Sequence, residues 1–525
     1  MPIRMSGLVS GLDTENIIKE LMAAQSQKKT KIENKITKHE WKTEKWQDLN
    51  KKLYDFYKGS LSKARLEGSF QTRKGSSADE TKVKATASGG VAAYGTHKVK
   101  VEQLASAQFV TGSQLGEVKN ASGKNVTVSG ATKLSQLGIS VKAGEESTIT
   151  IASGDKKVDL NVTEETTVND FLTACRDAGL TANYDTDQKR FFLTAEDSGS
   201  EHAFSITSKT KGGADGDALK KLGLSEVKYT KKDDGTVEYE YDKTNPDFAV
   251  KEASNSIIYL NGARLVNSSN EISVNGLNLE LNAATGDEEI SINVTKDTQA
   301  VYDMVKSFIK DYNELLKELS DAYYADSSYG YEPLTSEQRE AMNDEDIEKW
   351  EKKIKDSLLR RDSTVNSLMS TMKMTMAGTV DYNGKKYSLS TLGIVTTDYK
   401  EKGQLHIEGD ADDETTAGKE DKLMAAIEED PDMVMKIVTD MAGKLYSTFG
   451  DKMKTTTTSS ALTFYEDKQM KTDLTKYKKE LSTMEDKLSA MEDRYYKQFT
   501  AMEKALSQLN SQSSSLASLF GGSSM

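Results

Sequence analysis

The chain has 525 residues, too many for one hydrophobic core, and the usual domain size predicts about three or four units. Hydrophobic residues make up 36% and charged residues 29%, so we expect small cores and a large surface, which suit an elongated molecule. The formal net charge is −13, and no basic cluster exceeds a short lysine run, which argues against nucleic-acid binding.

The sequence shows neither a membrane anchor nor a secretion signal. No stretch approaches the ~20 apolar residues of a membrane span, so we expect no membrane insertion. Residues 1–11 are polar and contain glycine, unlike the apolar core of a signal peptide. We therefore expect a cytoplasmic protein, or one that leaves the cell without a cleaved signal peptide. The single cysteine, Cys175, excludes an intrachain disulfide.

The first predicted element is a long helix that Asp13 or Thr14 caps and that ends at Gly59. Residues 25–31 are polar, and we expect a break or flexible joint there; the alternative is one continuous helix with a poorly packed stretch. The seam of this helix is apolar before and after that stretch, at Ile17, Ile18, Leu21, Met22, Ile32, Ile36, Trp46, Leu53 and Tyr57. Trp41 and Trp46 point to different faces, so we expect Trp46 to pack internally and Trp41 to serve a subunit contact.

A β-rich region follows the first helix. Residues 82–105 alternate in polarity, and strands are also predicted at 148–151 and 158–162. A short helix over 168–178 places Phe171, Leu172 and Cys175 on one face, and a hairpin follows about residues 185–188. Asn261-Gly262 and Asn275-Gly276 each separate two apolar runs, which predicts two type I′ hairpins.

Helices return after residue 297. A broad apolar stripe that includes Phe308 and Tyr312 predicts a helix to about residue 319. Further helices are expected over 336–359, 365–376 and 422–438, with a short β excursion over 387–409. The last helix, 468–510, contains no Gly or Pro, and its apolar residues recur at steps of three and four, as in a coiled coil: Leu474, Tyr477, Leu481, Met484, Leu488, Met491, Tyr495, Phe499, Met502, Leu506 and Leu509.

This order predicts a multidomain α+β protein in which terminal coiled-coil helices and a helical leg enclose inserted β-rich head domains. We expect a terminal coiled-coil segment from residues 1–40 and 466–525, and a leg from 41–76 and 296–465. An inner β head domain would comprise 77–108 and 251–295, with an outer α+β head domain over 109–250 inserted into it.

Nothing in the sequence indicates catalysis, a cofactor or a metal. The four histidines (His39, His97, His202 and His406) lack metal-ligand spacing. The acidic runs 343–346 and 410–414 lack the spacing of a calcium loop and are expected to be solvated, with at most weak cation binding at the second. Cys175, on an apolar helix face, is expected in a core. We therefore expect a non-enzymatic chain.

Several segments resemble the family of flagellar filament cap proteins, also called hook-associated protein 2. Its N-terminal signature is similar to Ser6-Gly7-Leu8-Val9-Ser10-Gly11-Leu12-Asp13-Thr14 with Ile17-Ile18 and Leu21-Met22. Residues 101–108 resemble the family's strand that closes into the head, and residues 167–207 resemble its hook-associated repeat. Phe308-Ile309-Lys310-Asp311-Tyr312-Asn313 and the C-terminal seam fit its leg and end.

The resemblance implies a homo-oligomeric ring at the flagellum tip that promotes flagellin folding and insertion and prevents flagellin loss. A pentamer is favoured, with a tetramer or hexamer as alternatives. Flagellin, hook-associated junction proteins and an export chaperone are the implied partners, and export uses the flagellar channel. Filament contacts are expected at Ile17, Ile18, Leu21, Met22, Leu506, Leu509, Leu516 and Phe520, and leg packing or subunit contacts at Trp41, Trp46, Leu53, Phe308 and Tyr312.

Two other readings stay open at this stage. An exposed β head could make the chain a surface adhesin for mucin or a host glycan. Helical ends around a β middle are also typical of a hook–filament junction protein or a flagellin with a large head. The opening Ser10-Gly11-Leu12-Asp13 and the head inserted after residues 105–108 favour the cap.

Overall fold

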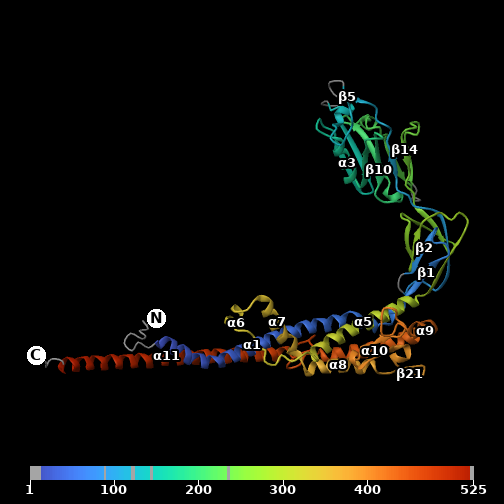
Figure 1. The fold of residues 1–525 in the computed structure, drawn as a ribbon. Coiled ribbons are helices and arrows are strands. Elements are labelled where there is room, and N and C mark those ends of the chain that lie inside the picture. The colour runs from blue at the N-terminus through green and yellow to red at the C-terminus, as the bar shows by residue number, and fades with distance from the viewer. Residues whose placement is uncertain (1–12, 88–89, 120–123, 142–145, 233–236, 521–525) are drawn as a thin grey trace. The chain divides into compact units, whose positions relative to one another are not determined.

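The computed structural model describes residues 13–87, 90–119, 124–141, 146–232 and 237–520, with the side chains of 518–520 left out. The chain divides into two compact units, of which the first combines Met1–Phe70 with Thr298–Met525 and the second is Gln71–Asp297. The first unit is helical and the second is built from sheets (Figure 1). The predicted fold class, helical ends enclosing β-rich regions, is confirmed. The domain boundaries expected within each unit stay predictions.

The first unit begins with helix α1, Thr14–Lys58. The Asp13 carboxylate accepts a hydrogen bond from the backbone N–H of Asn16 at 3.0 Å and so caps the helix. The helix ends at Gly59, as predicted. Residues 1–12, which carry most of the resemblance at the N-terminus, lie outside the described residues.

The joint expected over residues 25–31 is wrong, because α1 runs through this stretch without a break. Ser26 and Thr30 donate their hydroxyl hydrogens to the carbonyls one turn earlier, at 2.9 and 3.3 Å. Lys29 forms ion pairs with Glu33 at 3.5 Å and Glu485 at 3.0 Å. Gln and Lys are good helix formers, and long polar side chains satisfied by neighbours need no break in the backbone.

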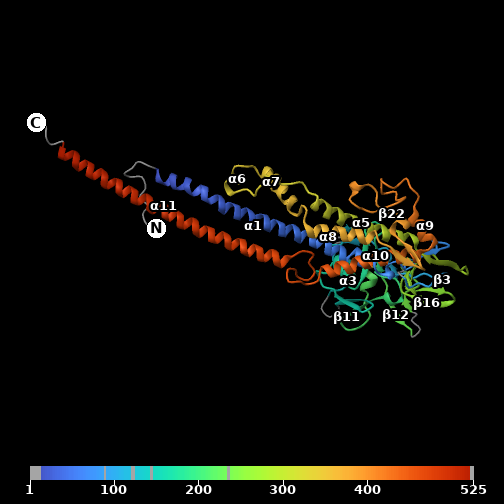
Figure 2. The same cartoon turned by 90° about the horizontal axis from the view of Figure 1, so that it is seen from below.

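Helix α11, Asp467–Phe520, runs antiparallel beside α1 (Figures 1 and 2). It is longer than predicted, because the serine-rich end from 511 to 520 continues the helix. Among the described side chains of α11, only Leu488 and Glu503 are buried. The seam residues from Leu474 to Leu506 are otherwise half-buried, so the two helices make a shallow contact.

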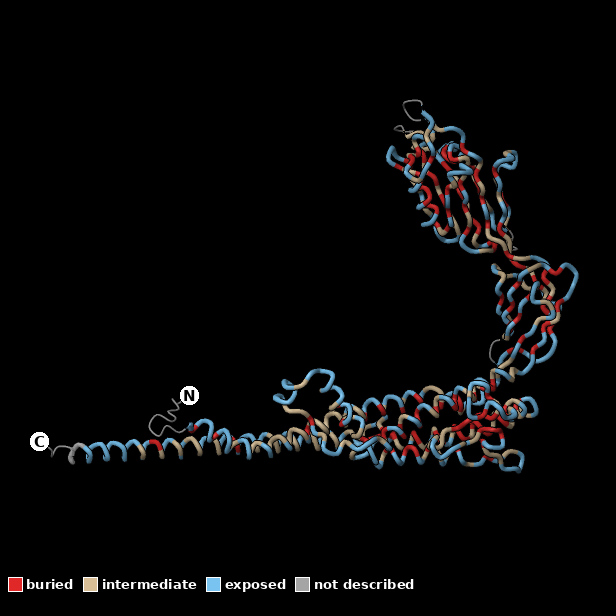
Figure 3. Tube along the Cα trace, in the orientation of Figure 1, coloured by how far each residue is buried: buried red, intermediate tan, exposed pale blue. Residues whose placement is uncertain are grey.

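The core of the first unit lies around the second half of α1. There α1 contacts α2 (Ser60–Ala64) and α5 (Thr298–Tyr323), and these two helices pack with α8 (Ser363–Met376), α9 (Lys422–Glu429) and α10 (Pro431–Lys452). Figure 3 shows buried residues concentrated in this bundle and sparse along the outer part of α11. Its largest buried side chains include Leu53, Phe56, Phe308, Tyr312 and Phe449.

Two predicted helices of this unit are interrupted. The stretch 422–438 is split between α9 and α10, because Asp430 caps a new helix whose first residue is Pro431. The stretch 336–359 contains α6 (Ser336–Glu340), α7 (Asp344–Asp356) and a 3₁₀ turn at Ser357–Leu359, since Asn343 starts a fresh cap. The short β excursion begins before the expected 387–409, and consists of β20 (Val380–Tyr382) with β21 (Lys385–Tyr387), and β22 (Ile394–Val395) with β23 (His406–Ile407).

In the second unit, strands from both ends of the segment form one antiparallel sheet in the order β1-β19-β3-β15-β16. The bounds are β1 Arg73–Ser77, β3 Gly95–Gln103, β15 Ser256–Leu260, β16 Ala263–Asn267 and β19 Ile290–Lys296. A second sheet has the order β17-β18-β2, with β2 Val83–Ala87, β17 Glu271–Val274 and β18 Leu277–Leu281. The two sheets share one apolar cluster, which includes Val99, Val101, Ile258, Leu279 and Ile292.

Both predicted type I′ hairpins are confirmed. Asn261 and Gly262 have φ of 51° and 84°, and Asn275 and Gly276 have φ of 49° and 78°. Positive φ at both central residues matches the twist of the flanking strands, which explains the Asn-Gly pairs.

The middle of the second unit contains two further sheets, of four and five strands. Their orders are β14-β4-β10-β9 and β13-β12-β11-β7-β8, with a small β5-β6 pair. Helices α3 (Val168–Asp177) and α4 (Ala218–Lys221) join a core that includes Phe171, Phe191 and Phe204. The strand bounds are β4 Phe109–Thr111, β5 Val118–Lys119, β6 Asn125–Val126, β7 Ser147–Ser153, β8 Lys156–Asn161, β9 Leu180–Asp185, β10 Arg190–Ala195, β11 Phe204–Thr210, β12 Val227–Lys231, β13 Val237–Tyr241 and β14 Ala249–Lys251.

Candidate functional site

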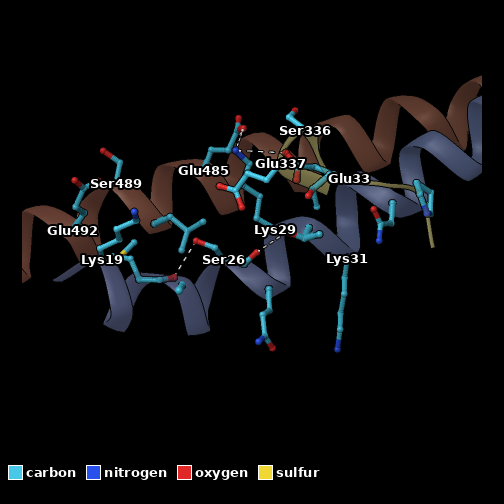
Figure 4. A pocket seen from close by; sticks show the side chains of 18 of the residues that line it. Lys19, Ser26, Lys29, Lys31, Glu33, Ser336, Glu337, Glu485, Ser489 and Glu492 are labelled. Atoms are coloured by element: carbon cyan, nitrogen blue, oxygen red, sulfur yellow. Dashed lines mark hydrogen bonds and ion pairs between the residues drawn. The ribbon is translucent and has the colours of Figure 1, made fainter. Parts of the chain in front are cut away.

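A groove with a volume of about 2130 Å³ runs along the pair α1–α11 of the first unit. Its floor is the first half of α1, from Asp13 to Lys38. One wall is α11 between Glu485 and Tyr496, and the other is the segment from Glu332 to Arg339. Figure 4 shows Glu485, Ser489 and Glu492 on α11 above Lys19, Ser26 and Lys29 on α1.

Two ion pairs fix the register between α1 and α11. Lys29 Nζ lies 3.0 Å from Glu485 Oε1, and Lys478 Nζ lies 2.9 Å from Glu40 Oε1. The hydrogen bond with Glu485 is the main cause that raises the pKa of Lys29, against the lowering by burial. These contacts place residue 29 beside 485 and residue 40 beside 478, as an antiparallel pair requires.

Aromatic contacts add to this register. The His39 and Tyr477 rings meet edge to face with centroids 5.4 Å apart, and Lys35 Nζ lies 3.8 Å from the Tyr477 centroid. His39 Nε2 is 2.7 Å from the backbone oxygen of Met470. The polar side chains of α1 that interrupt its apolar seam therefore contact α11 directly.

The opposite wall belongs to the segment between α5 and α8, residues 324–362, which we call the excursion and which contacts α1. Glu332 forms an ion pair with Lys38 at 2.7 Å, and Trp350 Nε1 donates to the Glu332 carbonyl at 2.8 Å. The Trp350 ring lies 4.5 Å from that of Tyr331. Glu351, 8% exposed, pairs with Arg339 and with Lys355. These pairs hold α6 and α7 beside the groove.

The structure places the expected filament-contact residues in three different surroundings. Ile18 is 2% exposed, inside the helix pair, and Met22 lines the groove half-buried. Ile17 and Leu21 are exposed on α1. Leu506 is half-buried, Leu509 and Leu516 are 61% and 53% exposed, and the Phe520 side chain lies outside the described residues. Whether these residues contact a filament stays a prediction.

The end of α11 extends past the start of α1. Thr14 lies about fifteen residues before Lys29, so in an antiparallel pair it faces roughly residue 500 of α11. Leu506, Leu509 and Leu516 therefore lie beyond the level at which the described part of α1 begins. They form an apolar stripe on a segment, 505–517, without a charged residue.

The expected leg residues come together in the core, with one exception. Trp46, Leu53, Phe308 and Tyr312 are all buried. Trp46 stacks on Tyr465 with centroids 5.4 Å apart and ring planes at 6°. Trp41 is half-buried, and Lys355 Nζ of α7 lies 4.7 Å from the centroid of its ring. Trp41 thus contacts the excursion of its own chain, and a subunit contact at Trp41 stays a prediction.

Several titratable groups outside the groove have partners or are buried. Lys306 bridges Asp410 and Asp412 at 2.6 Å each, and His406 Nδ1 lies 2.7 Å from Asp413, so these carboxylates have cationic or imidazole partners. Burial raises the pKa of the Cys175 thiol to about 12. Within the described part of the chain, no cluster of three or more His, Cys, Asp or Glu side chains could hold a metal. No described helix is long and apolar enough to cross a membrane.

Sequence reasoning missed the excursion that forms the second wall. The ion pair of Glu332 with Lys38 links segments 294 residues apart, and Trp350 bonds the Glu332 backbone 18 residues away within the excursion itself. The pairing of a tryptophan with an acidic loop gives no periodic signal. The one sequence signal for an acidic neighbour is the row of lysines at 35, 38 and 42 on one side of α1.

Comparison with known proteins identifies what the chain is similar to. Residues 10–108 match the family model described as "Flagellar hook-associated protein 2 N-terminus", and residues 253–511 match "Flagellar hook-associated protein 2 C-terminus". Together the two matches cover more than half of the chain. They include both helices of the groove and the excursion beside it.

Relatives extend the similarity over the whole length. The flagellar hook-associated protein 2 of Halalkalibacterium halodurans is 25% identical, covering 99% of this chain and 100% of its own. The flagellar hook-associated protein 2 of Escherichia coli K12 is 24% identical, covering 99% of this chain and 98% of its own. Among solved structures, the D1-D2-D3 domains of the Escherichia coli flagellar cap protein FliD match 82% of this chain and 99% of their own, with 20% identity and a TM-score of 0.46.

Proposed function

The chain belongs to the flagellar hook-associated protein 2 family, and on that premise we propose that it caps the distal end of the flagellar filament as a homo-oligomeric ring. The family is one of structural flagellar cap proteins and not of enzymes. In this proposal the ring retains flagellin at the growing tip and gives each arriving flagellin subunit a sheltered place to fold and insert.

The observation that carries the proposal is the exposed apolar surface at the end of the terminal helix pair. The end of α11 presents the exposed Leu509 and Leu516, together with the half-buried Leu506, on an uncharged segment beyond the start of α1. Exposed apolar residues on one side of an amphipathic helix can bind other helices. The family implies that the helical ends of flagellin at the filament tip bind this surface.

The shallow α1–α11 contact suits a ring that must advance as the filament grows. A cap has to bind tightly enough to stay and weakly enough to step. Half-buried seam residues and exposed ion pairs, such as Lys29–Glu485, each contribute little, about 0.2–1 kcal/mol for an exposed pair. Many weak contacts within the helix pair can exchange one at a time, so the two terminal helices can shift against each other as the ring advances, whereas a fully buried contact would hold them rigid.

The partners and the location follow from the same premise. We expect flagellin beneath the ring, hook-associated junction proteins at the site where the cap first assembles, and an export chaperone before secretion. The chain would reach the flagellum tip through the export channel without a cleaved signal peptide. The number of subunits is expected to be five, with four or six as alternatives.

The test replaces Leu506, Leu509 and Leu516 together by Gln in the full chain and introduces the variant into a motile strain that lacks its own cap gene. We expect the unaltered chain to restore filaments and swimming, and the variant to release unpolymerised flagellin into the medium. A control that replaces Gln508 and Gln512 by Ala on the same segment should restore filaments. Full-length filaments with the leucine variant would refute the role of this stripe.

A further inference from the structure

Two tyrosines from distant parts of the chain stack on each other at the surface of the helical unit. Tyr57 lies in the last turn of α1, and Tyr446 lies in the second half of α10. Their ring centroids are 4.1 Å apart and their planes are inclined by 13°, so the two phenols lie face to face. Both residues are half-buried. The fold therefore holds the pair in contact while solvent still reaches it.

The neighbours of this stack fix its geometry. The Arg65 guanidinium lies 4.1 Å from the centroid of the Tyr446 ring, and since two groups at this distance cannot share one face, Arg65 and Tyr57 enclose that ring. A Cβ at Gly450, one turn after Tyr446, would lie 3.4 Å from the Tyr57 hydroxyl oxygen, so the Tyr57 ring lies along α10. Burial and a hydrogen bond between the two hydroxyl groups raise the pKa of Tyr57 to about 12, so it stays a neutral phenol at pH 7.

The other tyrosine pairs lack this arrangement. Four of them are in ring contact in the described part of the chain, at centroid distances from 4.9 to 6.4 Å: Tyr54–Tyr57, Tyr229–Tyr239, Tyr323–Tyr324 and Tyr382–Tyr387. The pair at 4.9 Å meets edge to face, at 89°. Among the described tyrosine contacts, the pair of Tyr57 and Tyr446 is thus the closest and the nearest to parallel.

We propose that Tyr57 and Tyr446 form an oxidative cross-linking site, at which a one-electron oxidant joins the two phenols into dityrosine. Each phenol loses one electron and one proton and becomes a tyrosyl radical, whose unpaired electron lies on the oxygen and on the ring carbons next to it. One such carbon of each ring then forms the new carbon–carbon bond, and the hydrogen that it carried moves to its phenolic oxygen. Hydrogen peroxide, acting through a haem peroxidase, takes up the two electrons and two protons and becomes two molecules of water.

The stack supplies the proximity that coupling needs. Two radicals have to meet within their lifetime, and groups that are already held in contact react far faster than groups that must find each other by diffusion. Because the hydroxyl groups of Tyr57 and Tyr446 are hydrogen-bonded, the ring carbons beside those hydroxyls lie close as well. Half-buried rings can tilt toward each other as the bond forms, without disturbing a closed core.

The product would tie α1 to α10 by a covalent bond. Such a bond closes a long loop of the chain and so lowers the entropy of the unfolded state, as a disulfide does. The single cysteine, Cys175, is buried in the β-rich unit and cannot supply a link of this kind. The site does not depend on the capping role. In the proposed location at the filament tip, however, the chain lies outside the reducing cytoplasm.

The test oxidises the full chain at low concentration with a haem peroxidase and an equimolar amount of hydrogen peroxide. Dityrosine fluorescence reports coupling, peptide mass mapping identifies the linked residues, and a denaturing gel separates links within one copy from links between copies. Tyr57→Phe and Tyr446→Phe each keep the ring contact but remove a hydroxyl that coupling requires. The matched controls are Tyr54→Phe, the neighbouring ring on α1, and Tyr329→Phe, at a residue that is 95% exposed.

We expect one main cross-linked peptide that joins residues 57 and 446, in a chain that has lost two hydrogen atoms and migrates as a single copy. The fluorescence should be lost in Tyr57→Phe and in Tyr446→Phe and should be unchanged in both controls. The chain unfolded in urea should give far less of this peptide, because only the fold brings the two rings together. The cross-linked chain should unfold at a higher urea concentration than the untreated chain.

Fluorescence that persists in Tyr57→Phe or Tyr446→Phe would overturn the proposal. So would its loss in Tyr329→Phe, because exposure and not stacking would then select the site. Links only between copies, or no dityrosine in the folded chain, would overturn it as well. The peptide map of the unaltered chain decides the question even if a variant misfolds, since a link between any other two residues contradicts the assigned pair.

Discussion

The stacking of Trp46 on Tyr465 is predicted to be a main link between α1 and the start of α11. Trp46 is 2% exposed, and replacing such a tryptophan by alanine costs about 3–5 kcal/mol. The parallel rings, with centroids 5.4 Å apart, add a coupling of about 0.5–1.5 kcal/mol beyond the buried area. Trp46→Ala should therefore destabilise the helical unit strongly and loosen the terminal pair.

The assay is urea unfolding of the full chain, followed by the helical circular-dichroism signal, for Trp46→Ala, Tyr465→Ala and the double variant. The double variant should be more stable than the sum of the two losses predicts, by the coupling energy. Trp41→Ala is the matched control on the same helix. Its ring is half-buried and contacts Lys355, so its loss should be about 0.5–1 kcal/mol for the cation–π contact plus a small packing loss.

Equal losses for Trp41→Ala and Trp46→Ala would refute this reasoning, because they would show that burial in the core does not decide the cost. Strict additivity of Trp46→Ala and Tyr465→Ala would show that the two rings do not interact in solution.

Two further predictions concern the β-rich unit. In urea unfolding, Gly276→Ala should destabilise this unit more than Gly262→Ala. The backbone φ is positive at both positions, but a Cβ at Gly276 would lie 2.5 Å from the Ala92 nitrogen, whereas a Cβ at Gly262 would have nothing within 4 Å. Equal losses of stability would contradict the close approach at Gly276. The Cys175 thiol, with its pKa raised by burial to about 12, should stay unreactive toward a thiol reagent at neutral pH until the unit unfolds. Because the folded pKa lies above the ordinary value of 9.0, this group's contribution to stability is complete below about pH 9 and is lost as the pH rises toward 12. Cys175→Ala should reduce that alkaline loss; rapid labelling of the folded chain would refute the burial.

The sequence predicted those elements whose signals are local. The Asn-Gly pairs specified both hairpins, because positive φ at two consecutive residues restricts the choice of side chain. The heptad steps from Leu474 to Leu506 specified the pairing face of α11. Gly59 marked the end of α1.

Contacts between distant segments decided the features that the sequence did not predict. The polar stretch 25–31 is helical because Gln and Lys are good helix formers, and Lys29 gains a further partner in Glu485, about 450 residues later. One wall of the groove depends on Glu332, which pairs with Lys38 of α1 and whose carbonyl accepts a hydrogen bond from Trp350. Periodicity reports which face of a helix is apolar, but it does not identify the segment that satisfies a polar side chain.

The central claim, that the chain caps the filament, is tested most directly by locating it on growing flagella. Filaments from cells that carry an epitope-labelled full chain are imaged by electron microscopy with a gold-labelled antibody. The proposal predicts one cluster of label at the distal end of each filament. Label at the filament base would instead indicate a junction protein, and label spread over the cell surface an adhesin; either result would contradict the cap.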